Sequence, residues 1–242
     1  MKLINEVKNM YYNKKIVEAK FLERPNRFQG YVELNGERIL TRVPNTGRCK
    51  EILIEGCTVL LREENNPKRK TKYDLIGAYK GEKLIIIDSQ IPNKVVEEAL
   101  INKKICKLTK YNIIEREKTY GKSRFDFRLS NENGEIYYLE VKGVTLENNK
   151  HCKFPDAPTE RGRKHILELV DAIEKGYKGG ILFLIQLEDV CDFTPNYETD
   201  PEFGEALKFA KDKGVDIFVY NCKVTKEEIT LLDQKDIILS DN

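Results

Sequence analysis

Apolar and polar residues alternate most regularly in two neighbouring segments, residues 123–129 and 137–142. In the first segment, Phe125 and Phe127 alternate with charged residues, and the second segment repeats this pattern with other apolar residues. A period of two residues is typical of a β-strand, because successive side chains point to opposite faces. Between the segments, residues 131–134 have the sequence Asn-Glu-Asn-Gly, which favours a turn. The pattern therefore predicts a β-hairpin.

The polar positions of this hairpin carry candidate chemistry. Glu140 and Lys142 are two residues apart and share one face of their strand, and strand pairing is expected to bring Asp126 beside them. Two adjacent carboxylates repel each other unless a cation lies between them, and a nearby lysine can hold a water molecule or a developing negative charge. The three residues predict metal-assisted phosphodiester hydrolysis. The alternative is a solvated sheet face with an ordinary cross-strand ion pair.

Upstream of this hairpin, short strand-like runs alternate with turns. An Asn-Gly turn at residues 35–36 separates two alternating runs and predicts a second hairpin. Five or six short strands in this length fit a small β-barrel, including the OB type, which often binds single-stranded nucleic acid. The predicted strands are residues 16–22, 30–34, 37–43, 57–62, 73–79 and 83–88.

From about residue 92 the pattern changes to mixed helices and strands. Asn93 is expected to cap a first helix, and Thr159 a second one after a long loop that begins at Gly143. The order αβββαβαβ predicts a mixed sheet covered by helices. The predicted helices are residues 95–101, 159–175 and 202–213, and the predicted strands are 111–117, 123–129, 136–142, 181–185 and 215–220.

The composition excludes several classes of protein. The 242 residues are 40% hydrophobic and 34% charged, and no apolar run approaches the ~18–20 residues that a membrane-spanning helix needs. With no signal-peptide pattern at the start, a cytoplasmic protein without membrane contact is expected. Residues 1–90 hold 18 Lys+Arg against 12 Asp+Glu, net +6, and the remainder holds 24 against 28, net −4. The basic half is suited to a polyanion, or the excess simply aids solubility.

Cysteine and histidine give little support for a zinc site. The six cysteines contain no Cys-x-x-Cys pair, so we expect small buried hydrophobic residues rather than zinc ligands or disulfides. The two histidines, His151 and His165, lack partners at zinc-ligand spacing. With so little histidine, metal-hydroxide chemistry is favoured over a histidine general base.

Six segments spread along nearly the whole chain resemble one known family, the sugar fermentation stimulation protein A family. The αβββαβ order with Asp126 and the Glu140-x-Lys142 pattern also resembles the PD-(D/E)XK nuclease superfamily. In place of the nominal proline of that motif stands Phe125, at a position where the superfamily tolerates variation. The matching segments are residues 24–28, 43–48, 73–76, 123–126, 140–146 and 154–165.

The resemblance implies both a fold class and a site. The fold class is α/β plus all-β: an OB-like β-barrel (residues 1–88) followed by a PD-(D/E)XK nuclease-like mixed-sheet domain (residues 89–242). It implies that Asp126 and Glu140 bind Mg²⁺ or Mn²⁺, with the backbone carbonyl of Val141 as a third ligand. Lys142 would orient or deprotonate the attacking water, or stabilise the phosphorane-like charge.

The resemblance also implies an acidic residue from the first helix of the second domain. Glu98 is the candidate for this position, and Glu97 is its rival. A solvated helix face is the alternative for both.

Nucleic-acid contacts are expected from two loops and one helix. Guanidinium groups pair with phosphates, an aromatic ring stacks on a base, and glycine permits close approach of a backbone. The alternatives are an Asx-type turn with Phe28 in the barrel core, and a charged solvent face on the helix. The candidates are Arg24, Asn26, Arg27 and Phe28, then Asn45, Thr46, Gly47 and Arg48, and finally Arg161 and Lys164.

Two hypotheses for the function therefore compete. The first is a metal-dependent nuclease that acts on DNA, on RNA or on both. The second is a non-catalytic DNA-binding regulator of sugar metabolism genes on a nuclease-like scaffold, since fold alone does not decide between them. The sequence shows no helix-turn-helix pattern with a basic recognition helix, which counts against sequence-specific binding to an operator. The sequence contains no separate motif for a sugar-handling enzyme. Whether the protein forms a homodimer is left undecided by the sequence.

Overall fold

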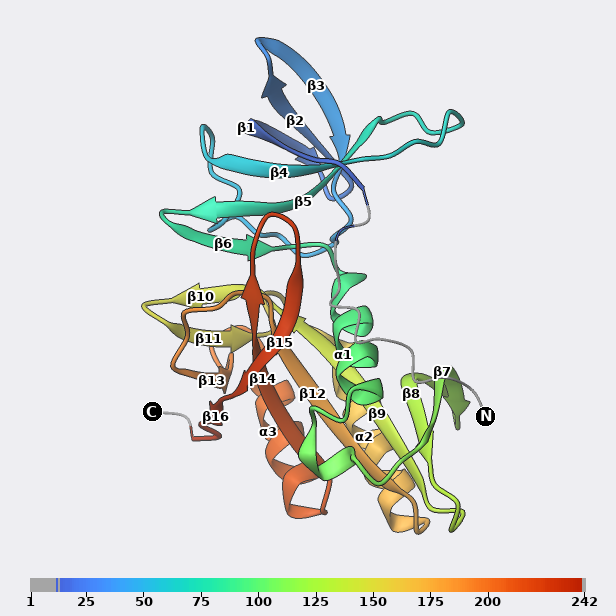
Figure 1. Cartoon of the computed structure of the whole chain (residues 1–242). Helices are drawn as coiled ribbons and strands as arrows, with labels where there is room; N and C mark the ends of the chain where they lie inside the picture. Colours follow the sequence, from blue (N-terminus) through green and yellow to red (C-terminus); the bar gives the residue numbers. More distant parts are fainter. Residues whose placement is uncertain (1–11, 13, 241–242) are drawn as a thin grey trace, which may run out of the picture.

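The computed structural model describes Tyr12 and residues 14–240 and has two domains stacked end to end (Figure 1). The amino-terminal domain is the predicted OB barrel, closed in the order β1-β2-β3-β5-β4-β1, with β6 added beside β5. Asn35 and Gly36 both have positive φ, as the predicted Asn-Gly turn between β2 and β3 requires. The strands are β1 (Ile16–Asn26), β2 (Gln29–Leu34), β3 (Glu37–Arg42), β4 (Thr58–Glu63), β5 (Tyr73–Lys80) and β6 (Lys83–Ile86).

The carboxy-terminal domain is built on a six-stranded mixed sheet in the order β15-β14-β12-β9-β8-β7. Strands β9, β12 and β14 run parallel, and the outer pairs are antiparallel. The elements are α1 (Ile91–Ile101), η1 (Cys106–Leu108), β7 (Ile113–Tyr120), β8 (Ser123–Ser130), β9 (Ile136–Val144), α2 (Glu160–Glu174), β12 (Lys178–Ile185), α3 (Pro201–Asp212), β14 (Asp216–Val224) and β15 (Ile229–Gln234).

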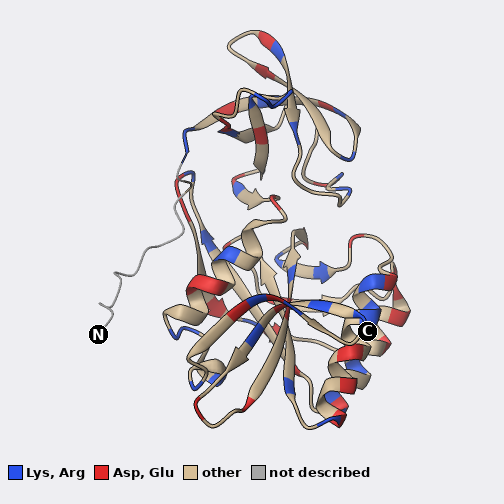
Figure 2. Ribbon diagram, turned by 90° about the vertical axis from the view of Figure 1, so that its right-hand side faces the viewer, with Lys and Arg blue, Asp and Glu red and all other residues tan. Residues whose placement is uncertain are grey.

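Helices cover both faces of this sheet. Helix α1 packs on one face in a core that contains Phe127 and Leu139, and α2 and α3 pack on the other in a core that contains Phe125 and Phe183. Figures 1 and 2 show α1 on the opposite side of the sheet from the other two helices. Acidic and basic residues are intermixed over both domains in Figure 2.

Four short strands in the second half of the chain were not predicted. They form a separate sheet in the order β10-β11-β13-β16, and the first two of them occupy the segment expected to be a loop. Runs of two to four residues are too short for a periodic pattern to stand out. Their bounds are β10 (Leu146–Asn148), β11 (His151–Phe154), β13 (Asp192–Pro195) and β16 (Asp236–Ile237).

The two predicted helix caps have different outcomes. Helix α1 begins at Ile91 with Pro92 in its first turn, where a missing N–H costs nothing, so Asn93 is not its cap. The Thr159 cap is confirmed by its side chain accepting a hydrogen bond from the Gly162 N–H.

Of the six cysteines, all free as expected, three are buried and Cys106 and Cys191 are exposed. Among the described residues, no helix is long and apolar enough to cross a membrane.

A buried carboxylate ties the two domains together. Glu147 of β10 is 3% exposed and accepts hydrogen bonds from Lys83 Nζ at 2.7 Å and Lys80 Nζ at 2.9 Å, both on the β5–β6 hairpin. The Lys150 N–H donates to the same carboxylate at 2.7 Å. Burial alone would raise the pKa of Glu147, but these three donors outweigh it and lower the pKa to about 2.

Glu147→Gln is therefore expected to lower the free energy of unfolding by about 1–3 kcal/mol at pH 7. Because the folded-state pKa of Glu147 is depressed, its contribution is fully present above about pH 4.5 and is lost as the pH falls toward about 2. Urea denaturation of wild type and variant at pH 7, 4 and 3 should show the difference shrinking with pH. Glu82→Gln, an exposed carboxylate in the same hairpin region, is the matched control. A pH-independent difference would contradict the assignment.

Candidate active site

Strands β8 and β9 form the predicted hairpin, but they separate at Asp126. Their pairing ends at Phe127 opposite Leu139, and beyond it Asp126 reaches across with its side chain instead of its backbone. Its Oδ2 accepts the Val141 N–H at 2.8 Å, and its Oδ1 accepts Asn93 Nδ2 of α1 at 2.7 Å. Burial, and after it the charge of Glu140, raise the pKa of Asp126.

This separation corrects the expected face alternation in β8. Phe125 packs in the α2 core and Phe127 in the α1 core, so the two do not share a face. Asp126 lies where the chain changes sides, and it enters the site at the edge of the separating strands instead of from a regular strand face. The expected relation between Glu140 and Lys142 holds, because Lys142 Nζ donates to Glu140 Oε1 at 2.5 Å.

Glu140 is the most enclosed group of the site. It is 3% exposed, and its Oε1 also accepts a hydrogen bond from His165 Nδ1 of α2 at 2.5 Å. Burial by itself would raise the pKa of Glu140, but His165 and the charge of Lys142 outweigh it, so the pKa is lowered. Glu140 is thereby kept ionised in a largely apolar setting.

The second oxygen of Glu140 is left without a partner. Among the described residues, Oε2 is buried and accepts no hydrogen bond. A buried carboxylate oxygen without a donor is costly, and a cation satisfies it. No cluster of three His, Cys, Asp or Glu side chains occurs in the described part of the chain. Two carboxylates supplemented by backbone oxygen and water fit hard divalent cations such as Mg²⁺ or Mn²⁺.

His165 is a site residue that sequence reasoning missed. Its imidazole is 5% exposed and packs edge-on against Phe125. Because an ionised carboxylate only accepts, Nδ1 carries the proton, and Nε2 is left to accept from Arg161 Nε at 3.5 Å. The available signal was helical spacing, since Arg161 and His165 are four residues apart on α2 and share a face.

The helix residues expected at the site take different positions. Glu98 lies 4.0 Å from Lys104, beyond the end of α1, and the α1 residue that contacts Asp126 is Asn93. Glu97 is four residues after Asn93 and therefore shares its face, where it pairs with Arg116. The choice between Glu98 and its rival Glu97 stays a prediction. On α2, Lys164 donates to the Lys122 carbonyl at 2.9 Å, and Arg161 joins the site through His165.

Arg24 organises the binding loops from inside and does not face a ligand. Its two terminal nitrogens donate to four backbone carbonyls at 2.7–2.8 Å, those of Arg27, Asn45, Gly47 and Arg48. Carbonyls occupy both terminal nitrogens and the Nε is buried, so this guanidinium is not open to a phosphate and the expectation is corrected. Asn45 is also structural, because its side chain donates to the Ile87 carbonyl and accepts the Gly47 N–H.

The tip of the β1–β2 hairpin faces outward. Asn26 accepts the Phe28 N–H at 2.9 Å in an Asx turn, as the alternative interpretation proposed, but Phe28 is 61% exposed and not in the barrel core. Thr46 is exposed, and within the described residues the Arg27 and Arg48 side chains form no hydrogen bond or ion pair. These groups remain open to a ligand.

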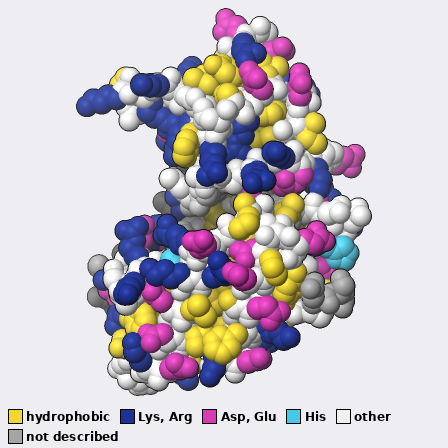
Figure 3. All heavy atoms as spheres, turned by 180° about the vertical axis from the view of Figure 1, so that it is seen from behind, with side chains coloured by type: hydrophobic (Ala, Val, Ile, Leu, Met, Phe, Trp, Pro, Cys, Tyr) yellow, Lys and Arg dark blue, Asp and Glu magenta, His cyan; other side chains and the backbone are white. Residues whose placement is uncertain are grey.

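The loop that contains Gly47 touches the second domain. The Arg48 N–H donates to Asp156 Oδ2 at 3.0 Å, and a Cβ at Gly47 would lie 2.7 Å from the same oxygen. Glycine lets the loop approach this closely, because any larger residue would have to displace the Asp156 carboxylate. Seen from behind, Lys and Arg side chains gather on both domains on either side of the narrowing between them (Figure 3).

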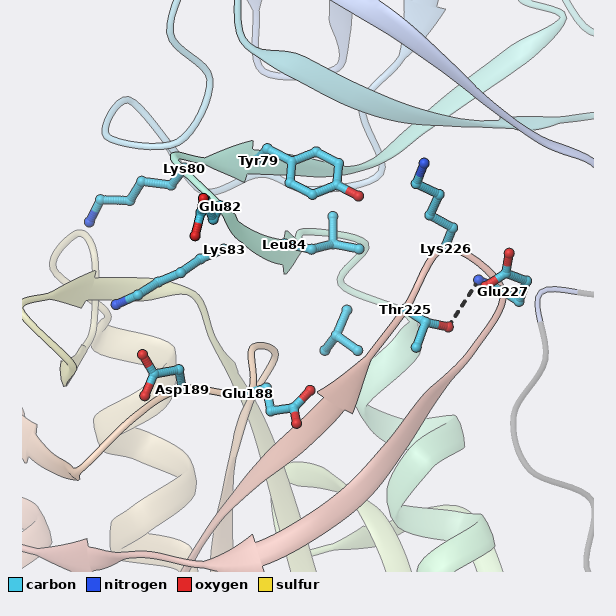
Figure 4. A pocket seen from close by; sticks show the side chains of 11 residues that line it. Tyr79, Lys80, Glu82, Lys83, Leu84, Glu188, Asp189, Thr225, Lys226 and Glu227 are labelled. Carbon is cyan, nitrogen blue, oxygen red and sulfur yellow. Dashed lines mark hydrogen bonds between the residues drawn. The ribbon is translucent and has the colours of Figure 1, made fainter.

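A cavity of about 940 Å³ lies away from the carboxylates, between the β5–β6 hairpin and the turn that follows β14. Figure 4 shows Tyr79 and Leu84 facing Thr225 and Lys226 across it. Lys226 pairs with Glu18, and the other lysines of its wall pair with Glu147. Because these lysines are already paired with carboxylates, this cavity is a poor phosphate site.

Comparison with known proteins places the chain in a family. The family description "SfsA N-terminal OB domain" matches residues 22–87, and "Sugar fermentation stimulation protein RE domain" matches residues 90–228. The chain is 66% identical over 230 residues to a sugar fermentation stimulation protein homolog of Clostridium perfringens, covering 95% of this chain and all of that protein. A homolog from Clostridium acetobutylicum is 62% identical over 91% of this chain and 96% of its own length.

A solved structure of Pyrococcus furiosus SfsA in complex with Ca²⁺ is similar across nearly the whole molecule. Its TM-score is 0.86 at 29% identity, covering 95% of this chain and 99% of that one. Both domains, and not one alone, are therefore shared in sequence and in fold. The chain belongs to the sugar fermentation stimulation protein family.

Proposed function

We propose that this protein is a metal-dependent nuclease whose catalytic residues are Asp126, Glu140 and Lys142. The observation that carries the proposal is the buried, unpartnered Oε2 of Glu140 beside a carboxylate whose pKa is raised. A module that only binds nucleic acid gains nothing from burying two carboxylates where phosphates approach. The Ca²⁺ bound to the related Pyrococcus protein supports divalent-cation binding in this fold.

Each residue has a distinct role in this proposal. Asp126 and Glu140 hold Mg²⁺ or Mn²⁺, with the Val141 carbonyl as a further ligand. The bound metal supplies an activated water and neutralises charge on the phosphate. Lys142, 17% exposed and 2.5 Å from Glu140, orients that water or stabilises the developing negative charge. His165 fixes the orientation of Glu140 and is a positioning residue.

In this proposal the barrel domain binds the nucleic acid. Phe28 offers an exposed ring for a base, and Arg27 and Arg48 offer unpaired cations for phosphates. Asn26 and Asn45 shape the two loops through hydrogen bonds to their backbones. DNA is the proposed partner, and RNA is tested alongside it.

The test is cleavage of end-labelled single- and double-stranded DNA and RNA with Mg²⁺, Mn²⁺ or EDTA. Asp126→Asn, Glu140→Gln and Lys142→Ala are each expected to lower the cleavage rate at least about 100-fold while binding persists. EDTA should abolish cleavage by the wild type. Glu132→Gln, in the turn of the same hairpin, should cleave normally.

Tight binding with no cutting under any metal would rule out the enzyme. It would leave the alternative, a DNA-binding regulator on a nuclease-like scaffold. Cutting that survives Glu140→Gln would instead move the reaction to another site.

Phe28→Ala is expected to weaken binding of a single-stranded oligonucleotide about tenfold, because a stacked base contributes roughly 1–3 kcal/mol. The cleavage rate at saturating substrate should not change, since Phe28 lies in the barrel domain. Fluorescence anisotropy measures the affinity. Ile54→Ala is the control, because Ile54 is a comparably exposed apolar residue of the same domain, at 57% against 61%. Equal losses for the two variants would show that Phe28 has no special role.

A further inference from the structure

A small cavity lies where the barrel loop meets the catalytic domain. Its volume is about 180 Å³. Its lining includes Gly143, the residue directly after Lys142, and residues 45–47 of the loop that carries proposed nucleic-acid contacts. A strand passing from the barrel to the carboxylates therefore runs along its mouth. The lining also includes Phe154 and Gln186.

Gln186 lines this cavity and carries an acceptor that no described residue uses. The residue is 1% exposed, and its Nε2 donates to the Ile86 carbonyl at 2.6 Å. That bond fixes which way the amide points. In the described part of the chain, Gln186 Oε1 is buried and accepts no hydrogen bond. It lies 3.6 Å from the position of a Cβ on Gly143, which lines the same cavity. A buried acceptor of this kind is costly unless a ligand donates to it.

The chemistry of the cavity selects a nucleobase over a phosphate. Phosphate diesters have no N–H or O–H to give to Gln186 Oε1, whereas ring N–H groups and exocyclic amines do. Gly143 and Gly47 line the cavity without a side chain, and Gly143 packs closely on Pro92, whose Cγ would lie 2.8 Å from a Cβ. Phe154 adds aromatic surface. Lys153 also lines the cavity, and its Nζ pairs with Glu198 at 3.4 Å.

We propose that this cavity is a subsite for one nucleobase of the bound strand, recognised through an N–H donated to Gln186 Oε1. The inference rests on the proposed nucleic-acid function and adds a specificity-determining residue to it. Its place beside Gly143 puts the recognised nucleotide next to the one whose phosphate faces Lys142. Bases that offer an N–H, such as cytosine through its 4-amino group, are preferred over analogues that offer none.

The test compares three fluorescent 12-mers in EDTA: deoxycytidine, 2-pyrimidinone deoxynucleoside, which differs from cytosine only by lacking the 4-amino group, and abasic sites. Wild type is expected to bind the cytosine oligomer about fivefold more tightly than the 2-pyrimidinone oligomer, which is typical for one neutral hydrogen bond. Gln186→Met should bind both equally. Gln234→Met, a glutamine on the exposed part of β15, should keep the wild-type preference.

The wild-type comparison needs no variant, so a Gln186 variant that fails to fold leaves the test intact. Equal wild-type affinity for the cytosine and 2-pyrimidinone oligomers would overturn the subsite and mean that the cavity holds only water. A preference that survives Gln186→Met would overturn the role of Gln186. Metal-dependent cleavage without base preference would remove this inference and leave the nuclease standing. Failure to bind any of the oligomers would remove both.

Discussion

The site depends on keeping one carboxylate ionised in an apolar interior. Glu140 lies between the sheet and α2, where burial alone would favour its neutral form. Lys142 from the same strand and His165 from α2 each donate to its Oε1, and their combined effect outweighs burial. The other oxygen stays free of partners within the described residues. The fold thus holds a negative charge ready and directs it at a position where a cation fits.

Several elements serve this arrangement. The Thr159 cap starts α2 at the turn that brings His165 over β9 five residues after Glu160. Separation of β8 from β9 frees the side chain of Asp126 to bind the Val141 N–H and Asn93. The barrel is held against the same edge by the Glu147 cluster and by the contact of Arg48 with Asp156. The loops of the barrel and the carboxylates on the sheet are therefore fixed relative to each other by these hydrogen bonds.

Much of this could be predicted from the sequence, because it follows from local periodicity. The alternation in residues 137–142 correctly puts Glu140 and Lys142 on one face, and the Asn-Gly turn correctly marks the β2–β3 hairpin. Strand periodicity failed at Asp126, since it assumes that pairing continues, and the pairing stops at Phe127. Helical position also failed for Asn93, whose amide bonds a strand residue instead of capping α1.

The remaining differences come from contacts between distant segments. Arg24 had the composition of a phosphate ligand, but four carbonyls from two loops occupy its guanidinium. His165 gave no spacing signal to Glu140, because 25 residues separate them in the chain. Gln186 is one glutamine among apolar residues, and only its neighbours in space make its free oxygen meaningful.

The most direct measurement is calorimetric titration of Mn²⁺ into the wild type, Glu140→Gln and His165→Leu at neutral pH. If Glu140 holds the cation, the wild type binds Mn²⁺, Glu140→Gln loses that binding, and His165→Leu binds it about 10–100-fold more weakly because its ligand is no longer oriented. Unchanged Mn²⁺ binding in Glu140→Gln would contradict the account, since the buried carboxylate would then not be the metal ligand.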